Sequence, residues 1–343
     1  MQRLLDTLEE THLLDKAGLV RLLEWDSPAL IHAADRVRKR YVGEEVHLRG
    51  LIEFSNYCRN SCFYCGLRAP NNRIKRFRMD IREIMEYARR AVGWGLKTIV
   101  LQSGEDGSYP IDDLCRVVSD IKDMDVAVTL SIGERTKEEY ACLKRAGANR
   151  YLLRIETSNP RLYERFHPGM SFQNRVRCLY YLKELGYEVG TGCLIGLPGQ
   201  TVEMLAEDLL FFKRLDIDML GMGPFIPCPL TPLENEKGGQ VPLVLKMMAL
   251  ARLLMPDINM PATTALATMD KNGYQKGLKA GANVIMPNMG RPDYRRLYAL
   301  YPGKAGSMED GLARLKSARE IIMKAGRKVG RGCGNRKRVL KKA

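Results

Sequence analysis

Three cysteines, Cys58, Cys62 and Cys65, stand at the spacing C-x3-C-x2-C, and an aromatic residue, Tyr64, precedes the last of them. Thiolates are the usual protein ligands of iron–sulfur clusters, and a cluster of four irons normally takes four of them. Three thiolates would leave one iron with an open position, which catalytic metal sites have and structural sites lack. The spacing therefore predicts a cluster with one iron free to bind a small molecule.

The same spacing resembles the signature of the radical S-adenosylmethionine (SAM) enzymes. In that chemistry the open iron chelates the amino and carboxylate groups of SAM and passes an electron into its sulfonium. A zinc knuckle, a redox pair or three unrelated buried thiols are the alternatives. Zinc sites usually pair two C-x2-C-like hooks or add histidines, and no second hook or nearby histidine follows Cys65. The polar residues between the first two cysteines, Arg59, Asn60 and Ser61, also speak against a buried core.

The composition predicts a soluble, cytoplasmic protein. Of the 343 residues, 45% are hydrophobic and 28% charged, which is ordinary for globular chains. No apolar run approaches the ~20 residues that span a bilayer, and the first ten residues carry acids where a signal peptide would be basic and then apolar. Nine cysteines in an intracellular chain indicate thiols and metal rather than disulfides.

The formal charge of +15 invites a nucleic-acid interpretation, but its distribution weakens it. From Lys324 to the end there are nine Lys or Arg residues and no acid, which leaves about +6 for the remainder. A basic tail can bind phosphate, yet it is more often a solvated end, and no recognition motif accompanies this one. We expect neither a nucleic-acid nor a membrane partner.

The remaining pattern predicts the elements that position the cysteines. Residues 1–45 are expected to form an N-terminal helical extension and residues 324–343 a basic tail. Between them, over residues 46–323, β-like runs alternate with helical stretches, which is typical of an α/β fold with a parallel (β/α)8 TIM barrel. A doubly wound open sheet is the alternative. The expected strands are His47–Phe54, Thr98–Ser103, Ala127–Ile132, Arg150–Thr157, Glu188–Ile195, Met219–Ile226, Met260–Ala267 and Ala282–Asn288.

Polar residues fall where barrel chemistry collects, at the C-terminal ends of the expected strands. Arg154 and Glu156 are two residues apart and share one face of their strand. Both would point into the barrel, where an unpaired charge is costly and demands a partner or a ligand. A structural ion pair is the alternative interpretation.

Motifs beyond the cysteine loop resemble the HydE family, the radical SAM maturases that help to build the active-site cluster of FeFe-hydrogenase. The resemblance runs from about Tyr41 to the basic end. It is carried by Glu53-Phe-Ser-Asn-Tyr-Cys58, Leu101-Gln-Ser-Gly-Glu-Asp106, Tyr151-Leu-Leu-Arg-Ile-Glu156, Gly196-Leu-Pro-Gly-Gln-Thr201, Gly223-Pro-Phe-Ile-Pro227, Pro261-Ala-Thr-Thr-Ala265 and Asn283-Val-Ile-Met-Pro-Asn288.

This resemblance implies that the three cysteines hold one 4Fe–4S cluster and that Gln102, Glu156 and Arg175 contact SAM. We also expect Ser103 to let the backbone approach SAM and Tyr64 to lie against its adenine. The expected substrate-lining residues are Thr129, Arg154, Met219, Thr263, Thr264, Met286, Tyr298 and Tyr301.

The implied reaction is reductive cleavage of SAM to methionine and a 5′-deoxyadenosyl radical. The radical would act on a cysteine-bound Fe(CO)2(CN) precursor, so the substrate is a small organometallic or amino-acid-derived molecule. A ferredoxin or flavodoxin would donate the electron, and sister hydrogenase maturases are further candidate partners.

Two departures from the family pattern carry expectations. Some members have three further cysteines for an accessory cluster, whereas residues 301–310 contain none, so we expect a single cluster. Ile155, where relatives can have histidine, should face away from the lumen by strand alternation.

Four other functions stay open from the residues alone. A methylornithine-synthase-like mutase shares the same barrel and cysteine loop, and a biotin-synthase-like enzyme would need ligands for a second cluster. A non-catalytic iron–sulfur carrier predicts a four-thiolate site, and a basic RNA-binding module predicts steeply salt-dependent binding.

Overall fold

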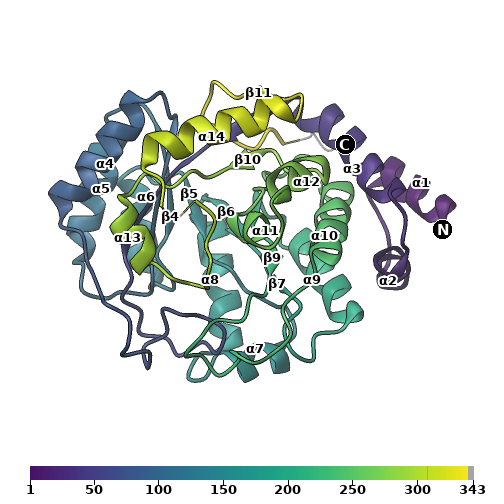
Figure 1. The fold of residues 1–343 in the computed structure, drawn as a ribbon, viewed down its shortest axis with the longest axis horizontal. Helices are drawn as coiled ribbons and strands as arrows, with labels where there is room; N and C mark the ends of the chain where they lie inside the picture. Colours follow the sequence, from purple (N-terminus) through teal and green to yellow (C-terminus); the bar gives the residue numbers. More distant parts are fainter. Residues whose placement is uncertain (307, 339–343) are drawn as a thin grey trace.

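A parallel sheet in the order β2-β3-β4-β5-β6-β8 forms most of a closed barrel (Figure 1). The computed structural model, which describes residues 1–306 and 308–338, continues the ring by pairing Met219 with Asn259 and Pro261 with Val284. β10 then pairs with β1, and Leu51 of β2 pairs with Asn288. The ring closes, so the predicted (β/α)8 barrel is confirmed rather than an open doubly wound sheet.

The hydrogen-bonded ladders are shorter than the expected strands. The predicted run His47–Phe54 divides at Arg49, and the run Arg150–Thr157 pairs regularly only as far as Leu152. The strands are β1 Glu45–Leu48, β2 Gly50–Ser55, β3 Thr98–Ser103, β4 Ala127–Ser131, β5 Arg150–Leu152, β6 Glu188–Thr191, β7 Leu194–Ile195, β8 Met219–Leu220, β9 Gly223–Pro224, β10 Val284–Ile285 and β11 Lys328–Val329.

The expected seventh strand, Met260–Ala267, is wrong over most of its length. Only Pro261 pairs within it, and a helix begins at Thr264. The physical reason is helix capping: the Thr263 hydroxyl accepts a hydrogen bond from the Leu266 amide, which satisfies a donor at the first helical turn.

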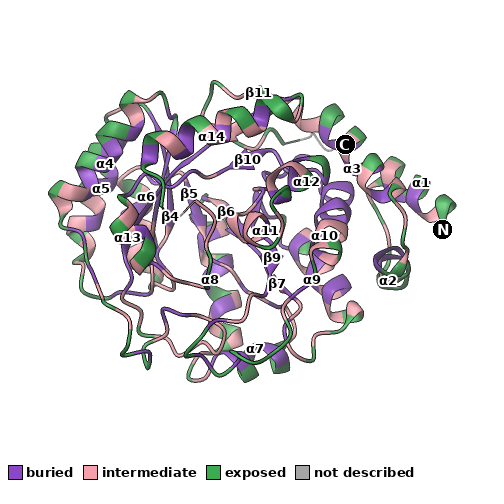
Figure 2. Cartoon of the chain, in the orientation of Figure 1, coloured by how far each residue is buried: buried purple, intermediate pink, exposed green. Residues whose placement is uncertain are grey.

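Helices cover the outside of the barrel with their buried faces inward (Figure 2). Their starts follow local capping chemistry: Asp80 caps α4, and Thr136 with Glu139 forms a capping box on α6. The helices are α1 Gln2–Thr11, α2 Lys16–Glu24, α3 Ala29–Val42, α4 Ile81–Gly93, α5 Ile111–Lys122, α6 Lys137–Arg145, α7 Pro160–Phe166, α8 Phe172–Glu184, α9 Val202–Arg214, α10 Val241–Leu254, α11 Thr264–Met269, α12 Gly273–Lys279, α13 Pro292–Leu297 and α14 Gly311–Lys324.

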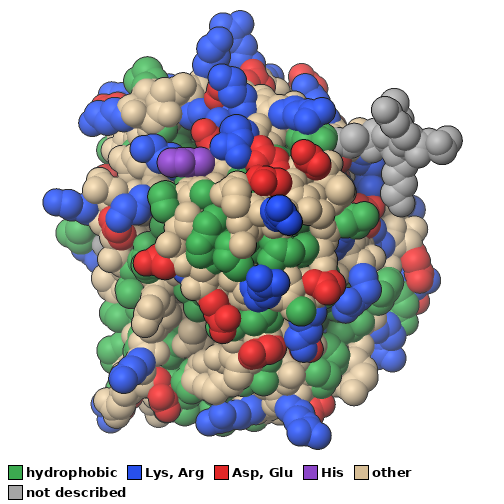
Figure 3. Space-filling model, turned by 90° about the vertical axis from the view of Figure 1, so that its right-hand side faces the viewer, with side chains coloured by type: hydrophobic (Ala, Val, Ile, Leu, Met, Phe, Trp, Pro, Cys, Tyr) green, Lys and Arg blue, Asp and Glu red, His purple; other side chains and the backbone are tan. Residues whose placement is uncertain are grey.

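The first three helices lie beside the barrel, at the right of Figure 1. α3 packs on α10, and α2 packs on α9. On this side of the molecule, Lys and Arg side chains are interspersed with Asp and Glu side chains (Figure 3). Within the described residues, no helix combines the length and the apolar character that crossing a bilayer would require.

The described part of the C-terminal segment is built into the barrel, although the sequence favoured a solvated end. β11 pairs in parallel with β1. The Cys333 carbonyl accepts hydrogen bonds from Thr98 and Arg150, and the Gly334 carbonyl accepts one from Arg49.

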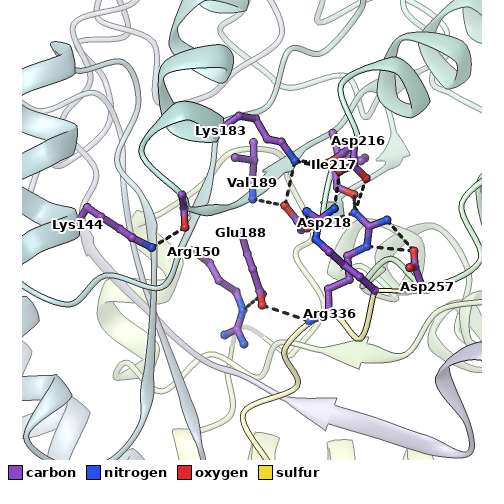
Figure 4. Close-up of polar contacts among 12 residues, drawn as sticks. Lys144, Arg150, Lys183, Glu188, Val189, Asp216, Ile217, Asp218, Asp257 and Arg336 are labelled. Carbon is purple, nitrogen blue, oxygen red and sulfur yellow. Dashed lines mark hydrogen bonds and ion pairs between the residues drawn. The ribbon is translucent and has the colours of Figure 1, made fainter. Parts of the chain in front are cut away.

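Arg336 is the main polar anchor of this segment. Its guanidinium bonds to Asp218 and Asp257, whose carboxylates are almost completely buried (Figure 4). A buried charge is tolerated only when it is paired with a charge of opposite sign. Arg327, Arg336 and Arg338 of this segment are thus paired with acids of the barrel and of residue 44, and residues 339–343 lie outside the described residues.

Candidate functional site

A cavity of about 370 Å³ lies inside the barrel, within the range of small-molecule sites. All the residues predicted to bind the cluster, SAM or the substrate line it, although they come from segments far apart in the chain. They are Cys58, Cys62, Tyr64, Cys65, Gln102, Ser103, Thr129, Arg154, Glu156, Arg175, Met219, Thr263, Thr264, Met286, Tyr298 and Tyr301.

The three cysteines stand in the loop between β2 and α4. Burial raises the pKa of each thiol, that of Cys62 to about 12, and the other thiols of the set add to the effect at Cys62 and Cys65. Ligation of iron would favour the thiolates and so oppose this burial cost. In the described part of the chain, no three His, Cys, Asp or Glu side chains converge on one metal-ion position. Three thiols that line one cavity are a donor set suited to an iron–sulfur cluster.

Arg76 and Gly104 shape the cysteine loop. The Arg76 guanidinium donates to the carbonyls of Asn56, Leu67, Arg68 and Asn71, at 2.5–3.1 Å.

A Cβ on Gly104 would lie only 2.2 Å from the Tyr57 carbonyl oxygen, so glycine is required there for packing against this loop. The Ser103 hydroxyl donates to the Gly104 carbonyl at 2.6 Å. The backbone that approaches Ser103–Gly104 closely is thus that of the cysteine loop. A close approach of SAM to the same residues stays a prediction.

Tyr64 is held in place by His167, a residue that the sequence analysis did not single out. Burial lowers the pKa of His167 to about 4, so the ring is neutral. Its Nδ1 lies 2.7 Å from the Tyr163 carbonyl and must carry the proton, which leaves Nε2 to accept a hydrogen bond from the Tyr64 hydroxyl at 2.8 Å. The Tyr64 ring is therefore oriented before any ligand enters.

Arg154 and Glu156 form the ion pair that was the alternative interpretation. Arg154 Nη2 lies 2.8 Å from Glu156 Oε2 but without hydrogen-bond geometry, so that oxygen has no hydrogen-bond partner among the described residues. Burial raises the pKa of Glu156, and the guanidinium groups of Arg154 and Arg175 oppose that rise.

Glu156 has φ 65°, in the left-handed region, which costs a non-glycine residue of order 1 kcal/mol or more. This backbone turn ends the regular strand while keeping both charged side chains at the cavity. Ile155 is fully buried in the hydrophobic core and does not line the cavity, as strand alternation predicted.

Two further polar atoms at the cavity lack protein partners. Thr129 Oγ1 and Arg154 Nε are buried without a hydrogen bond within the described residues. Arg154 is otherwise oriented by a 2.8 Å bond to the Cys193 carbonyl. Unsatisfied buried donors are costly unless a ligand or water completes them. The wall carrying Thr129 and Arg154 is therefore suited to a polar or anionic ligand.

Arg175 is surrounded by acceptors of the protein itself. Its Nε lies 2.7 Å from Glu134 Oε1, and its Nη2 lies 3.3 Å from Glu105 Oε1. Its Nη1 donates to the Arg154 carbonyl at 3.2 Å. The contact of Arg175 with SAM that the family resemblance implies stays a prediction. Glu105 and Glu134 were missed, although both follow expected strand ends.

A second buried charge pair, Lys304 with Glu53, was also missed. Lys304 Nζ bonds to Glu53 Oε1, and Asn288 donates to Glu53 Oε2 at 2.6 Å. Burial lowers the pKa of Lys304. Glu53 precedes the cysteine loop and Lys304 follows α13, so only the closed barrel brings them together. Nearby, the Gln102 amide donates to the Tyr298 hydroxyl at 3.3 Å.

The hydroxyl groups of Thr263 and Thr264 already have protein partners. Thr263 caps α11, and Thr264 Oγ1 lies 3.2 Å from the Tyr274 hydroxyl. Met219 Sδ accepts a hydrogen bond from Arg49 at 2.9 Å. These residues line the cavity without being free to make all of the contacts that the sequence suggested.

Behind Glu156, Asp208 makes stability depend on pH. Burial raises its pKa to about 7, although Ser158 donates to it. Because the folded state binds this proton more tightly than the unfolded state, the stabilisation is complete below about pH 4 and is lost as pH rises through 7, on the order of 4 kcal/mol in all. Asp208→Asn should keep the Ser158 contacts and remove this fall in the free energy of unfolding.

Urea unfolding at pH 5 and pH 8 measures this effect. Glu86→Gln, at an exposed position of α4 paired with Arg90, is the control and should follow the wild-type pH profile. Parallel profiles for Asp208→Asn and wild type would contradict the assignment.

Comparison with known proteins agrees with this geometry. Residues 52–212 match the Radical SAM superfamily. The chain is 55% identical to FeFe hydrogenase maturase subunit HydE of Thermotoga maritima over 312 residues, which covers 91% of this chain and 90% of the relative. It is 33% identical to 3-methylornithine synthase of Methanosarcina acetivorans, over 75% of this chain and 73% of that protein.

Among solved structures, methylornithine synthase (PylB) superposes with a TM-score of 0.83 at 28% identity, covering 96% of this chain and 97% of that one. The fold is thus shared with a methylornithine-forming enzyme, whereas the sequence lies much nearer to the maturase. Radical SAM enzymes use a 4Fe–4S cluster and SAM, and the three thiols and the cavity fit both. The chain belongs to the HydE family of radical SAM enzymes.

Proposed function

We propose that this protein is a cytoplasmic radical SAM maturase that acts on a cysteine-bound Fe(CO)2(CN) precursor during assembly of the FeFe-hydrogenase active-site cluster. The observation that carries the proposal is one cavity lined both by the three loop thiols and by Thr129 and Arg154, which carry unpaired polar atoms. The 55% identity to HydE of T. maritima supports the assignment of the pathway.

The bound cluster and SAM would supply the reductive cleavage that yields methionine and a 5′-deoxyadenosyl radical. Cys58, Cys62 and Cys65 would hold the cluster, and the oriented Tyr64 would flank the adenine. The Glu156 carboxylate, which lacks hydrogen bonds from described residues, is available to accept from the ribose hydroxyls. The enclosing barrel would keep water from the radical.

The substrate would lie against Thr129 and Arg154. A guanidinium with an unpaired Nε can donate to a carboxylate such as that of a cysteine ligand, and the Thr129 hydroxyl can add a second donor. Met219 and Met286 supply apolar surface beside these donors. A ferredoxin or flavodoxin would deliver the electron, and sister maturases would exchange the precursor.

Complementation of a hydrogenase host that lacks its HydE tests the pathway. We expect the gene for this chain to restore hydrogen evolution. The second candidate, a methylornithine-forming mutase, is favoured by the superposition with PylB. Incubation of the reconstituted protein with lysine, SAM and dithionite should then yield no methylornithine. Methylornithine without complementation would overturn the maturase proposal.

A further inference from the structure

The loop that carries the cluster cysteines has a charge of one sign. Residues 56–79 contain six Lys or Arg residues and no Asp or Glu. This contrasts with the mixed charges of the face shown in Figure 3. The six cations are Arg59, Arg68, Arg73, Lys75, Arg76 and Arg78.

Four of these cations already bind other groups of the protein. Arg59 pairs with Glu105, and Arg78 pairs with the buried Asp106. Arg76 holds the loop carbonyls, and Arg68 donates to the Ser61 carbonyl. They stabilise the loop, so their presence alone does not indicate a partner.

Arg73 and Lys75 are different. Both are exposed, and neither side chain forms a hydrogen bond or an ion pair within the described residues. They lie two positions apart in the loop that begins with the cluster cysteines and ends at α4. Residues 56–79 contain no acid, and the carboxylate of the next residue, Asp80, caps α4, so Arg73 and Lys75 leave a positive potential on the outer surface of the loop.

We propose that this outer surface, defined by Arg73 and Lys75, is the docking site of an acidic one-electron carrier protein. The proposal rests on the proposed function, because it assumes a cluster behind the loop. The cavity side of that cluster belongs to SAM and substrate, so a protein reductant approaches from the loop side. One electron would pass from the reduced carrier to the cluster, with no transfer of atoms or protons.

An acidic protein fits the surface better than a nucleic acid does. Strand binding usually adds exposed aromatic rings on which bases stack. Two rings of the cysteine loop are already stacked on its own cations: the Arg78 guanidinium carbon lies 3.5 Å from the centre of the Tyr57 ring, and Arg68 lies over Phe63. Charge without stacking surfaces favours electrostatic steering of a carrier, which is weakened by salt.

The test compares two double variants of the reconstituted holoenzyme. Arg73→Glu/Lys75→Glu reverses the proposed surface. Lys316→Glu/Lys324→Glu makes the same change of charge at exposed positions of α14, which lies at the opposite edge of the molecule in Figure 1. Stopped-flow absorbance follows cluster reduction by a reduced flavodoxin, and calorimetry follows binding of the oxidised flavodoxin.

We expect the loop variant to lose about tenfold or more in the rate of reduction by flavodoxin and in affinity at low salt. The control variant should stay within about twofold of wild type, and dithionite should reduce all three proteins equally. If the reversal prevents cluster loading, Arg73→Gln/Lys75→Gln replaces it with the same readouts and a smaller expected loss.

Equal flavodoxin rates and affinities in the loop and control variants would overturn the proposal. So would a single-stranded oligonucleotide that displaces flavodoxin from wild type but does not bind the loop variant. Failure of the proposed function is separate: dithionite would then reduce the cluster without any cleavage of SAM, whatever the flavodoxin result.

Discussion

Alanine at Cys58, Cys62 or Cys65 will abolish both cluster binding and SAM cleavage, whereas Cys228→Ala will leave both intact. The three loop thiols line the cavity, and their burial makes free thiolates unfavourable without iron. Loss of one ligand leaves two, which is too few for a stable site-differentiated cluster. Cluster absorption after reconstitution and the yield of 5′-deoxyadenosine measure the two effects.

Cys228 is the matched control because it is a buried thiol close to the cluster cysteines but outside their loop. It is buried, raises the pKa of Cys65 by its proximity, and lies 2.9 Å from the position that a Cβ on Gly66 would take. It does not line the cavity. Loss of the cluster in Cys228→Ala would indicate a fourth thiolate, as in a non-catalytic carrier, and would remove the open iron on which the proposed function depends.

The second large effect is a separation of SAM cleavage from maturation. Arg154→Ala should keep the cluster and still form 5′-deoxyadenosine, but should lose hydrogenase maturation by about 10- to 150-fold. Arg154 Nε is the unpaired donor on the substrate wall, and a charged hydrogen bond of this kind is worth about 1.5–3 kcal/mol. Parallel assays of 5′-deoxyadenosine and of hydrogen evolution measure the separation.

The ion pair with Glu156 makes a second variant necessary. Removing Arg154 leaves a buried carboxylate without its 2.8 Å partner, which would raise the pKa of Glu156 further and weaken SAM binding. Arg154→Lys keeps a positive charge beside Glu156 but lacks the Nε donor, and it should show the same loss of maturation. Full maturation by either variant would contradict the role of Arg154 in substrate binding.

Local sequence patterns predicted the cluster site and determined most of the fold. Ligand spacing is a property of a few adjacent residues, so C-x3-C-x2-C was sufficient to indicate three cluster ligands. Helix starts depend on one capping side chain and the next turn, which explains why Asp80 and Thr136 marked α4 and α6. Alternation along strands placed Thr129, Arg154 and Glu156 at the cavity for the same local reason.

The lengths of the hydrogen-bonded strands could be determined only once the neighbouring strands were known. A β-strand ends where its partner strand no longer offers hydrogen bonds, and the partner strands are not known from sequence alone. The sequence therefore did not reveal that the left-handed turn at Glu156 and the helix cap at Thr263 end their strands. The expected strands Arg150–Thr157 and Met260–Ala267 were too long for this reason.

Only the tertiary structure decided how the charged and polar side chains are partnered. Lys304 meets Glu53, His167 meets Tyr64, and Arg336 meets Asp218 across more than a hundred residues of sequence. Buried charges are stable only beside a partner, and closing the barrel is what brings these partners together. The sequence specified which residues face the lumen, whereas the closed fold determined which of them remain free to bind a ligand.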